Sequence, residues 1–228
     1  MAVTILIVED EPAISFVLRS NFKHEGYRVF TAPSAEAGLK LARRHSPDII
    51  ILDVMLPKMD GLEMLRILRQ ESQVPVLFLS AKKDEIDRIL GFKLGADDYI
   101  SKPFSIRELI LRVKAILKVT VFQAPKGTEK KVSLGKVEID FDRHDVRVHG
   151  KPVKLAPREF QILQLLIEAK GKVLSREQLL TSLWGDEKSY DIDIRGVDQH
   201  IARLRRKLLS ERSLITTLSN FGYQVRMP

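Results

Sequence analysis

Short apolar runs alternate with amphipathic stretches over the first 118 residues, and no other feature restricts the fold of this chain as strongly. Several runs are apolar at consecutive positions, which is typical of strands in a parallel sheet covered by helices on both faces. The predicted strands are Thr4–Val8, Arg28–Thr31, Asp48–Leu52, Val76–Leu79 and Asp98–Ile100. The predicted helices are Ile14–His24, Ala35–Arg44, Gly61–Gln70, Asp84–Leu94 and Ser105–Lys118. This alternation predicts an α/β domain with a doubly wound, five-stranded parallel sheet.

The pattern changes after residue 119. Residues 120–131 lose helical periodicity and gather Pro125, Gly127 and three lysines, so we interpret them as a linker. Residues 132–153 have the pattern of short alternating strands broken by turns, and a hairpin is expected at the end of the chain. The helices expected in between are Pro157–Ala169, Ser175–Trp184 and Ile192–Leu209. The sequence therefore predicts one domain over residues 1–119 and a smaller α+β domain over residues 132–228.

Composition and charge exclude some classes of protein and favour others. The chain has no cysteine, which excludes disulfides and thiolate metal sites. No stretch approaches the roughly 20 apolar residues of a membrane span, so we expect a soluble cytoplasmic protein without a membrane partner. Lys and Arg outnumber Asp and Glu by 18 to 16 in residues 1–120 and by 20 to 14 in residues 121–228. The basic second half favours a nucleic-acid partner, although a solvated basic surface would have the same charge.

Polar residues gather where the predicted strands of the first domain end. Glu9 and Asp10 follow the first strand, Asp53 the third, Ser80 the fourth and Lys102 the fifth. The carboxyl ends of parallel strands meet at one edge of the sheet, where ligands bind. Three converging carboxylates need a cation, and oxygen donors without His or Cys prefer Mg²⁺. Each residue alone could be a helix cap, a turn residue or a surface lysine. Together they predict a phosphoryl-transfer site with Asp53 as the nucleophile.

The motifs around these residues resemble those of a known family. LIVEDEP, ILDVMLPKMDG, LSAK and GADDYISKPF are similar to motifs of the receiver domain of bacterial two-component response regulators, a flavodoxin-like fold, over residues 3–118. The resemblance implies that a sensor histidine kinase is the phosphoryl donor and that the bond between Lys102 and Pro103 is cis. The site roles that it implies are a metal-binding pair at Glu9 and Asp10, the phosphoacceptor at Asp53, a magnesium-binding backbone carbonyl at Met55, a switch pair at Ser80 and Tyr99, and a phosphate-binding lysine at Lys102.

The same resemblance implies a switch driven by phosphorylation. A phosphoryl group adds roughly 1.5–2 negative charges and strong acceptor oxygens. Ser80 is expected to move toward it, and Tyr99 to turn inward into the vacated space, which creates a surface for a phosphorylation-dependent homodimer. The ion pairs implied across that dimer join Arg88 to Glu108 and Asp98 to Arg112 of the partner. Without the family, these four residues would be read as ordinary exposed charges on helix faces.

Residues 191–209 have the pattern of one amphipathic helix with a basic face. The apolar stripe comprises Ile194, Val197, Ile201, Leu204 and Leu208, and the opposite face comprises Arg195, Gln199, Ala202, Arg203 and Arg206. A buried seam with an outward face of Arg and Gln suits the major groove of double-stranded DNA, where arginine reads guanine and glutamine reads adenine. A solvated basic helix is the alternative. The three helices and the terminal hairpin favour DNA binding.

The second domain resembles the winged-helix output domain of the OmpR/PhoB family over residues 132–227, through KLAPREFQILQLLI, SREQLL, LWG and VDQHIARLRRKL. The resemblance implies a contact with a DNA base by Arg203 and supporting contacts with the DNA backbone by Arg195, His200 and Arg205. For Arg205, a structural role is also open. Trp184 would open a loop that contacts RNA polymerase, or would be a core tryptophan. Two departures weaken the expected DNA contacts: Ala202 stands where relatives often have a second arginine, and Ser219-Asn220 where the wing usually has Arg-Gly.

Two other functions compete with this interpretation. A Mg²⁺-dependent phosphohydrolase would carry its nucleophile after the first strand with a second Asp two residues on, and Glu9-Asp10-Glu11 lacks that spacing. We therefore expect no enzyme activity beyond Mg²⁺-dependent self-phosphorylation and autodephosphorylation at Asp53. The second alternative is a DNA-binding regulator that works without phosphorylation and uses its first domain only to dimerise.

Overall fold

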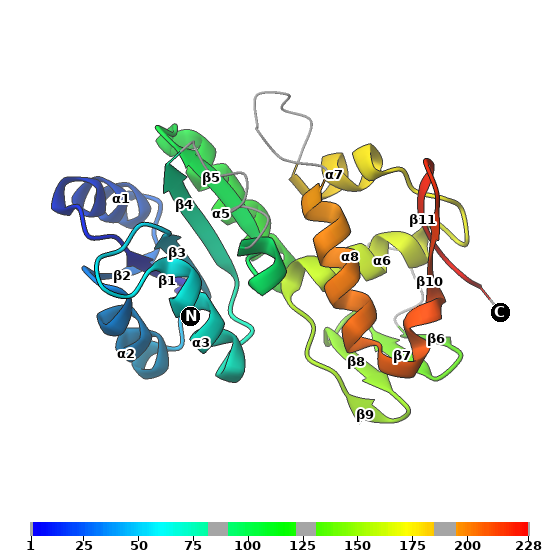
Figure 1. Ribbon diagram of the computed structural model, residues 1–228. Coiled ribbons are helices and arrows are strands. Elements are labelled where there is room, and N and C mark those ends of the chain that lie inside the picture. Colours follow the sequence, from blue (N-terminus) through cyan, green and yellow to red (C-terminus); the bar gives the residue numbers. More distant parts are fainter. Residues whose placement is uncertain (1, 82–90, 122–130, 185–194, 228) are drawn as a thin grey trace. The chain divides into compact units, whose positions relative to one another are not determined.

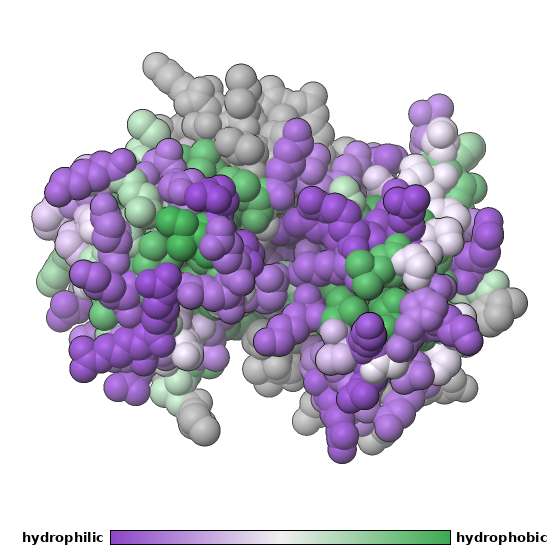
Figure 2. All heavy atoms as spheres, turned by 60° about the horizontal axis from the view of Figure 1, so that its bottom comes forward, coloured by the Kyte–Doolittle hydropathy of each residue, from purple (hydrophilic) through white to green (hydrophobic). Residues whose placement is uncertain are grey.

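The chain forms two compact units, Met1–Leu117 and Lys118–Pro228, each of which has its own hydrophobic core (Figure 1). The computed structural model describes residues 2–81, 91–121, 131–184 and 195–227. Within these residues no helix is both long enough and apolar enough to cross a bilayer. Hydrophilic side chains cover most of the face shown in Figure 2, and hydrophobic side chains form small patches between them.

A five-stranded sheet in the order β2-β1-β3-β4-β5 forms the centre of the first unit, and all neighbouring strands are parallel. The fold class predicted for the first domain is therefore confirmed. The strands are β1 (Thr4–Val8), β2 (Arg28–Ala32), β3 (Ile49–Asp53), β4 (Val76–Ala81) and β5 (Asp98–Lys102). The helices are α1 (Pro12–His24), α2 (Ala35–His45), α3 (Gly61–Glu71) and α5 (Ile106–Val121).

Helices cover both faces of this sheet, which explains why its strands are apolar without alternation. In β3, Ile49 and Ile51 pack in a cluster with side chains of α1 and α5. The residues between them, Ile50 and Leu52, pack in a second cluster with side chains of α2 and α3. Every residue of β3 is buried as a result.

The ends of several elements differ from the prediction. β4 and β5 each run two residues further than predicted, to Ala81 and Lys102, so Ser80 and Lys102 are strand residues. α5 continues to Val121, into the segment predicted as a linker, because no Gly or Pro interrupts the chain before Pro125. Most of the helix predicted over Asp84–Leu94 lies outside the described residues, and residues 91–94 are helical.

The second unit combines a small antiparallel sheet, three helices and a hairpin, which confirms the predicted α+β winged-helix architecture. The sheet has the order β6-β7-β8-β9, from strands β6 (Lys131–Leu134), β7 (Val137–Asp140), β8 (Asp145–Val148) and β9 (Lys151–Pro152). The helices are α6 (Pro157–Glu168), α7 (Arg176–Trp184), α8 (Arg195–Lys207) and the 3₁₀ turn η1 (Leu209–Leu214). The hairpin joins β10 (Ile215–Leu218) to β11 (Gly222–Val225).

Helix α7 begins with a capping box formed by Ser175 and Gln178. The Ser175 backbone N–H donates to the side-chain oxygen of Gln178 at 2.8 Å, and the Gln178 N–H donates to Ser175 Oγ at 3.1 Å. In the first unit, Ser34 and Asp60 cap α2 and α3 in the same position. These local bonds fix where the helices start.

Gly61 is required where α3 begins. A Cβ at this position would lie 2.2 Å from the carbonyl oxygen of Asp53, a backbone atom that cannot swing away. We expect Gly61→Ala to lower the free energy of unfolding of the first unit by about 1–3 kcal/mol through overpacking. Urea unfolding followed by circular dichroism measures this change. An unfolding curve identical to that of the wild type would contradict the close approach.

Candidate functional site

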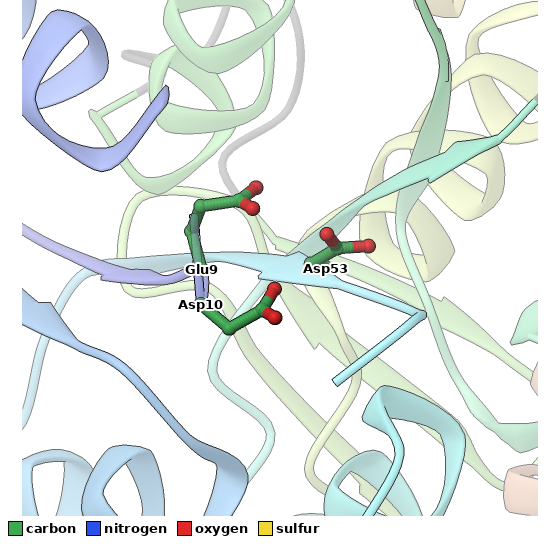
Figure 3. A group of neighbouring side chains, drawn as sticks. All are labelled: Glu9, Asp10 and Asp53. Carbon is green, nitrogen blue, oxygen red and sulfur yellow. The ribbon is translucent and has the colours of Figure 1, made fainter. Parts of the chain in front are cut away.

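Three carboxylates converge at the carboxyl edge of the parallel sheet. Glu9 and Asp10 follow β1, and Asp53 is the last residue of β3. Figure 3 shows the three side chains directed toward one shared space. An oxygen atom of each lies within 4.8 Å of an oxygen of the others, while Glu9 and Asp53 are buried. The structure therefore brings together the acidic residues that the strand ends predict.

Lys102 joins two of these carboxylates from the end of β5. Its Nζ donates to Asp53 Oδ2 at 2.6 Å and to the two oxygens of Glu9 at 3.0 and 3.2 Å. The predicted lysine therefore lies at the predicted nucleophile. The Lys102–Pro103 peptide bond is cis, as expected.

The charges of this site are only partly balanced by Lys102. Burial, together with the charge of Asp53, raises the pKa of Glu9 to about 7, against the lowering effect of Lys102. Burial would lower the pKa of Lys102, but its hydrogen bonds to Asp53 and Glu9 raise it overall. Burial thus disfavours the charged form of Glu9. A hard divalent cation such as Mg²⁺, which prefers oxygen ligands, fits this donor set and would favour the charged form.

Both oxygens of Asp53 have defined neighbours. Oδ2 accepts from Lys102, and Oδ1 accepts from the backbone N–H of Met55 at 3.0 Å. The Met55 side chain points into solvent, with 64% of its surface exposed. The loop after β3 therefore turns back so that its backbone, and not the Met55 side chain, lies at the carboxylate.

The predicted switch residues Ser80 and Tyr99 lie on the neighbouring strands β4 and β5. Asp53 is paired with Leu79 in the sheet, so Ser80 lies one position beyond the level of Asp53. Both switch residues are buried, and the ring of Tyr99 lies 6.1 Å from that of Phe78. Tyr99 thus occupies an inward position in this structure.

Two residues predicted to meet across a dimer meet within one chain. Arg112 Nη1 donates to Asp98 Oδ1 at 3.0 Å, and Arg112 also contacts Glu108 at 2.9 Å. Asp98 and Arg112 are both buried. Arg88 lies outside the described residues, and the pairing between chains stays a prediction.

Helix α8 confirms the predicted apolar stripe at Val197, Ile201, Leu204 and Leu208, all of which are buried. Ile194 lies outside the described residues, and nothing is described of the Arg195 side chain. Ala202 and Arg206 are exposed, and Gln199 is half-buried. These three residues define the described part of the outward face.

The outward position predicted for Arg203 is wrong. Its side chain is 6% exposed, lies with its Nε 3.6 Å from Glu159 Oε1 of α6, and contacts the buried ring of His200 through Nη2. Glu159 also accepts from Lys207 at 2.7 Å and from the Ala156 backbone N–H at 2.8 Å. A buried carboxylate on α6 therefore draws Arg203 inward, because an unpaired charge in the core would be costly.

Arg205 connects α8 to the hairpin, which agrees with the structural role left open for it. Its Nε donates to the Ile215 carbonyl at 3.0 Å and its Nη2 to Thr217 Oγ1 at 2.7 Å. Both acceptors belong to β10. Helix α8 and the hairpin are thus bonded to each other directly.

A polar network that the sequence did not reveal joins α7, α8 and β11. The Tyr223 hydroxyl donates to Asp198 at 2.6 Å, and Arg176 donates to the same carboxylate at 2.8 Å. Burial and the bond to Asp198 raise the pKa of Tyr223 to about 12. Tyr223 also pairs through its backbone with Leu174, in both directions. The hairpin is therefore held from two sides.

Trp184 is a core residue at the end of α7, with 6% of its surface exposed. The guanidinium of Arg158 lies 4.9 Å from the centre of its ring, and Arg158 donates to the Leu183 carbonyl. This position fits the core interpretation of Trp184. The loop that follows, residues 185–194, lies outside the described residues.

Comparison with known proteins finds a different family for each of the two units. Residues 5–114 match the response regulator receiver domain, and residues 150–225 match the family described as transcriptional regulatory protein, C terminal. The chain is 41% identical to the alkaline phosphatase synthesis transcriptional regulatory protein PhoP of Bacillus subtilis (strain 168), over 98% of this chain and 97% of that protein.

Solved structures are also similar to the whole chain. A mutant of RitR matches with a TM-score of 0.75 and 28% identity, over 100% of both chains. DrrB of Thermotoga maritima, described as an OmpR/PhoB homolog, matches with a TM-score of 0.51 and 30% identity, over 99% of both chains.

The carboxylate cluster predicts stabilisation by Mg²⁺. Binding to the folded state alone adds about 1.4 kcal/mol of stability when the free ion is at ten times its dissociation constant. We expect MgCl₂ to raise the midpoint of thermal unfolding relative to NaCl of equal ionic strength, and Asp10→Asn to reduce that rise. Glu63→Gln, which changes an exposed carboxylate paired with Arg66, is the matched control. Equal midpoints in the two salts would argue against a cation site.

Proposed function

Because the chain belongs to the OmpR/PhoB type of response regulators, which pair a receiver with a DNA-binding domain to regulate transcription, we propose that a sensor histidine kinase phosphorylates it at Asp53. The phosphorylated form dimerises and binds specific DNA sites. Because its target is DNA, the protein acts in the cytoplasm. The observation that carries the proposal is the arrangement at Asp53, with Lys102 on one oxygen and the Met55 N–H on the other.

The chemistry follows from the positions of these groups. A carboxylate oxygen of Asp53 attacks the phosphorus of the donor, the bond from phosphorus to the donor histidine breaks, and the imidazole leaves. The ammonium of Lys102, 2.6 Å from Asp53, offsets the negative charge on the transferring oxygens. Mg²⁺, held by Glu9, Asp10, Asp53 and the Met55 carbonyl, would stabilise the same charge. Water later attacks the phosphorus, the bond from phosphorus to the Asp53 oxygen breaks, and inorganic phosphate leaves, which restores the carboxylate.

The switch in this proposal uses Ser80 and Tyr99. Ser80 is buried on the strand next to Asp53 and carries a hydroxyl that can donate to a phosphoryl oxygen. A shift of Ser80 toward that oxygen changes the packing around Tyr99, on the next strand. Two ion pairs are proposed across the dimer. One joins Asp98 of β5 to Arg112 of α5 in the partner, and the other joins Arg88 to Glu108.

DNA binding is assigned to α8. Gln199 and Arg206 lie on its outward face, Arg195 opens the helix, and each is of a type that reads bases or binds phosphates. Arg203 and His200 are buried, so we assign them to holding the helix in position, and Arg205 to holding the hairpin. RNA polymerase is the partner proposed for the loop after Trp184.

A phosphoryl mimic tests the role of Asp53. We expect beryllofluoride with Mg²⁺ to convert the wild type from monomer to dimer and to leave Asp53→Asn unchanged, since the mimic binds a carboxylate oxygen. Sedimentation velocity measures the mass, and Glu63→Gln is the control. A wild type of the same mass in both conditions would favour the alternative, a DNA-binding regulator that works without phosphorylation.

Arg206 tests the assignment of α8 to DNA. Arg206→Ala should weaken binding to a duplex selected from a random library, and should reduce the slope of log affinity against log salt by about 0.9 if Arg206 contacts one phosphate. Arg147→Ala is the matched control, because Arg147 is an exposed arginine on β8 of the same unit. Equal affinity of Arg206→Ala and the wild type would remove Arg206 from the DNA surface.

A further inference from the structure

A fourth carboxylate lies at the rim of the carboxylate cluster. Glu11 precedes α1, and its Oε1 lies 4.0 Å from Nζ of Lys102, which donates to Asp53 Oδ2 at 2.6 Å. The Glu11 side chain is 63% exposed, whereas that of Glu9 is 0% exposed. A molecule that reaches the ammonium of Lys102 from solvent therefore comes within range of the Glu11 charge.

The backbone of Glu11 is fixed, although its side chain does not cap the helix. Its N–H donates to Glu9 Oε1 at 3.3 Å, and its carbonyl accepts from the Ser15 N–H at 3.0 Å in α1. The side chain makes no cap hydrogen bond, whereas the side chains of Ser34 and Asp60 cap α2 and α3. Glutamate is also not among the residues preferred at this position. The Glu11 carboxylate therefore takes no part in closing the helix, and its charge remains at the rim.

The charge of Glu11 is in excess once the cluster holds a cation. A divalent ion and Lys102 would together balance the formal charges of the converging carboxylates, which are Glu9, Asp10 and Asp53. Glu11 lies outside that set, so its negative charge has no counterpart in this balance. Charged groups at a site act on the approach of charged ligands. The rim therefore repels an incoming anion, and repels a dianion more strongly than a monoanion.

We propose that Glu11 is a specificity-determining residue that disfavours small dianionic phosphoryl donors, such as acyl phosphates, at Asp53. This inference deepens the proposed function and rests on phosphorylation at Asp53. A kinase can offset the same repulsion with binding energy from contacts away from the phosphoryl group, whereas a small donor has no such contacts. Glu11 thus reserves Asp53 for its protein donor.

Two small donors separate the effect of charge from other effects. Acetyl phosphate is a dianion at neutral pH, and phosphoramidate is a zwitterion that is a monoanion overall. In each case an oxygen of Asp53 attacks phosphorus. The phosphorus–oxygen bond breaks and acetate leaves with the electron pair, or the phosphorus–nitrogen bond breaks and ammonia leaves with the protons that its nitrogen already carries. Neither reaction takes a proton from Glu11, so the comparison between donors reports charge.

The test measures the rate constant of phosphorylation of the full chain by intact-mass spectrometry, with each donor at low and high salt. MgCl₂ is set above the concentration at which the thermal midpoint of each variant stops rising. We expect Glu11→Gln to raise the rate constant about tenfold with acetyl phosphate and about threefold with phosphoramidate at low salt, which is about threefold for each unit of donor charge. Both increases should shrink in about 1 M salt, where the Debye length is about 3 Å.

Two further variants serve as controls. Glu11→Asp keeps the charge and should keep the discrimination between the donors. Glu71→Gln should leave both rate constants unchanged, because Glu71 is an exposed carboxylate, paired with Arg43, at the last residue of α3. Helix α3 begins next to Asp53 and has 11 residues, so Glu71 lies about 16 Å along its axis from the site.

Equal rate constants of Glu11→Gln and the wild type with acetyl phosphate at low salt would overturn the proposal. So would an increase of the same size with both donors and at both salt concentrations, which would assign Glu11 a structural role. Failure of the proposed function looks different: neither the wild type nor Glu11→Gln would gain phosphate from either donor, or Asp53→Asn would gain as much as the wild type, and this inference would fall with it.

Discussion

The bonds of Lys102 to Asp53 and Glu9 are the interaction on which the first unit depends. Two buried carboxylates from β1 and β3 would repel each other, and the ammonium from β5 offsets that repulsion across the width of the sheet. Parallel strands place all three residues at one edge of the sheet. The fold therefore brings together the two carboxylates that repel each other and the ammonium group of Lys102 that offsets their charge. The remaining imbalance, visible in the raised pKa of Glu9, makes the edge receptive to a divalent ion.

The second unit is organised by a similar principle. The buried carboxylate of Glu159 on α6 contacts Arg203 and Lys207, which lie one turn apart on α8. These two ion pairs act together with the buried apolar stripe of α8 in setting the rotation of the helix about its axis. In each unit, then, a buried acid on one element is neutralised by bases from another element, and the residues assigned to function are positioned as a result.

The sequence predicted much of this, and the errors have physical reasons. The carboxyl ends of parallel strands meet at one edge of the sheet. The positions of Glu9, Asp53 and Lys102 after predicted strands were therefore enough to predict that these residues lie together. The helical periodicity of α8, by contrast, assigns its faces from the polarity of the residues of α8 alone. It contains no information about Glu159 of α6, which draws Arg203 inward. The bond between Tyr223 and Asp198 joins positions 25 apart with no local signature. Such contacts depend on packing between elements, which periodicity does not describe.

The pairing of Arg112 with Asp98 and Glu108 has a consequence for association at that face. In the proposed dimer, the basic group of a second chain that pairs with Asp98 would compete with Arg112 of the same chain, so an ion pair would be exchanged rather than gained. The electrostatic free energy of such a contact is the difference between the ion pair formed with the second chain and the similar ion pair lost within one chain. Asp98 and Arg112 are already desolvated when the chain folds. In the proposed dimer, this face would therefore add selectivity rather than binding energy, because it would favour a partner that offers both charges at the matching spacing.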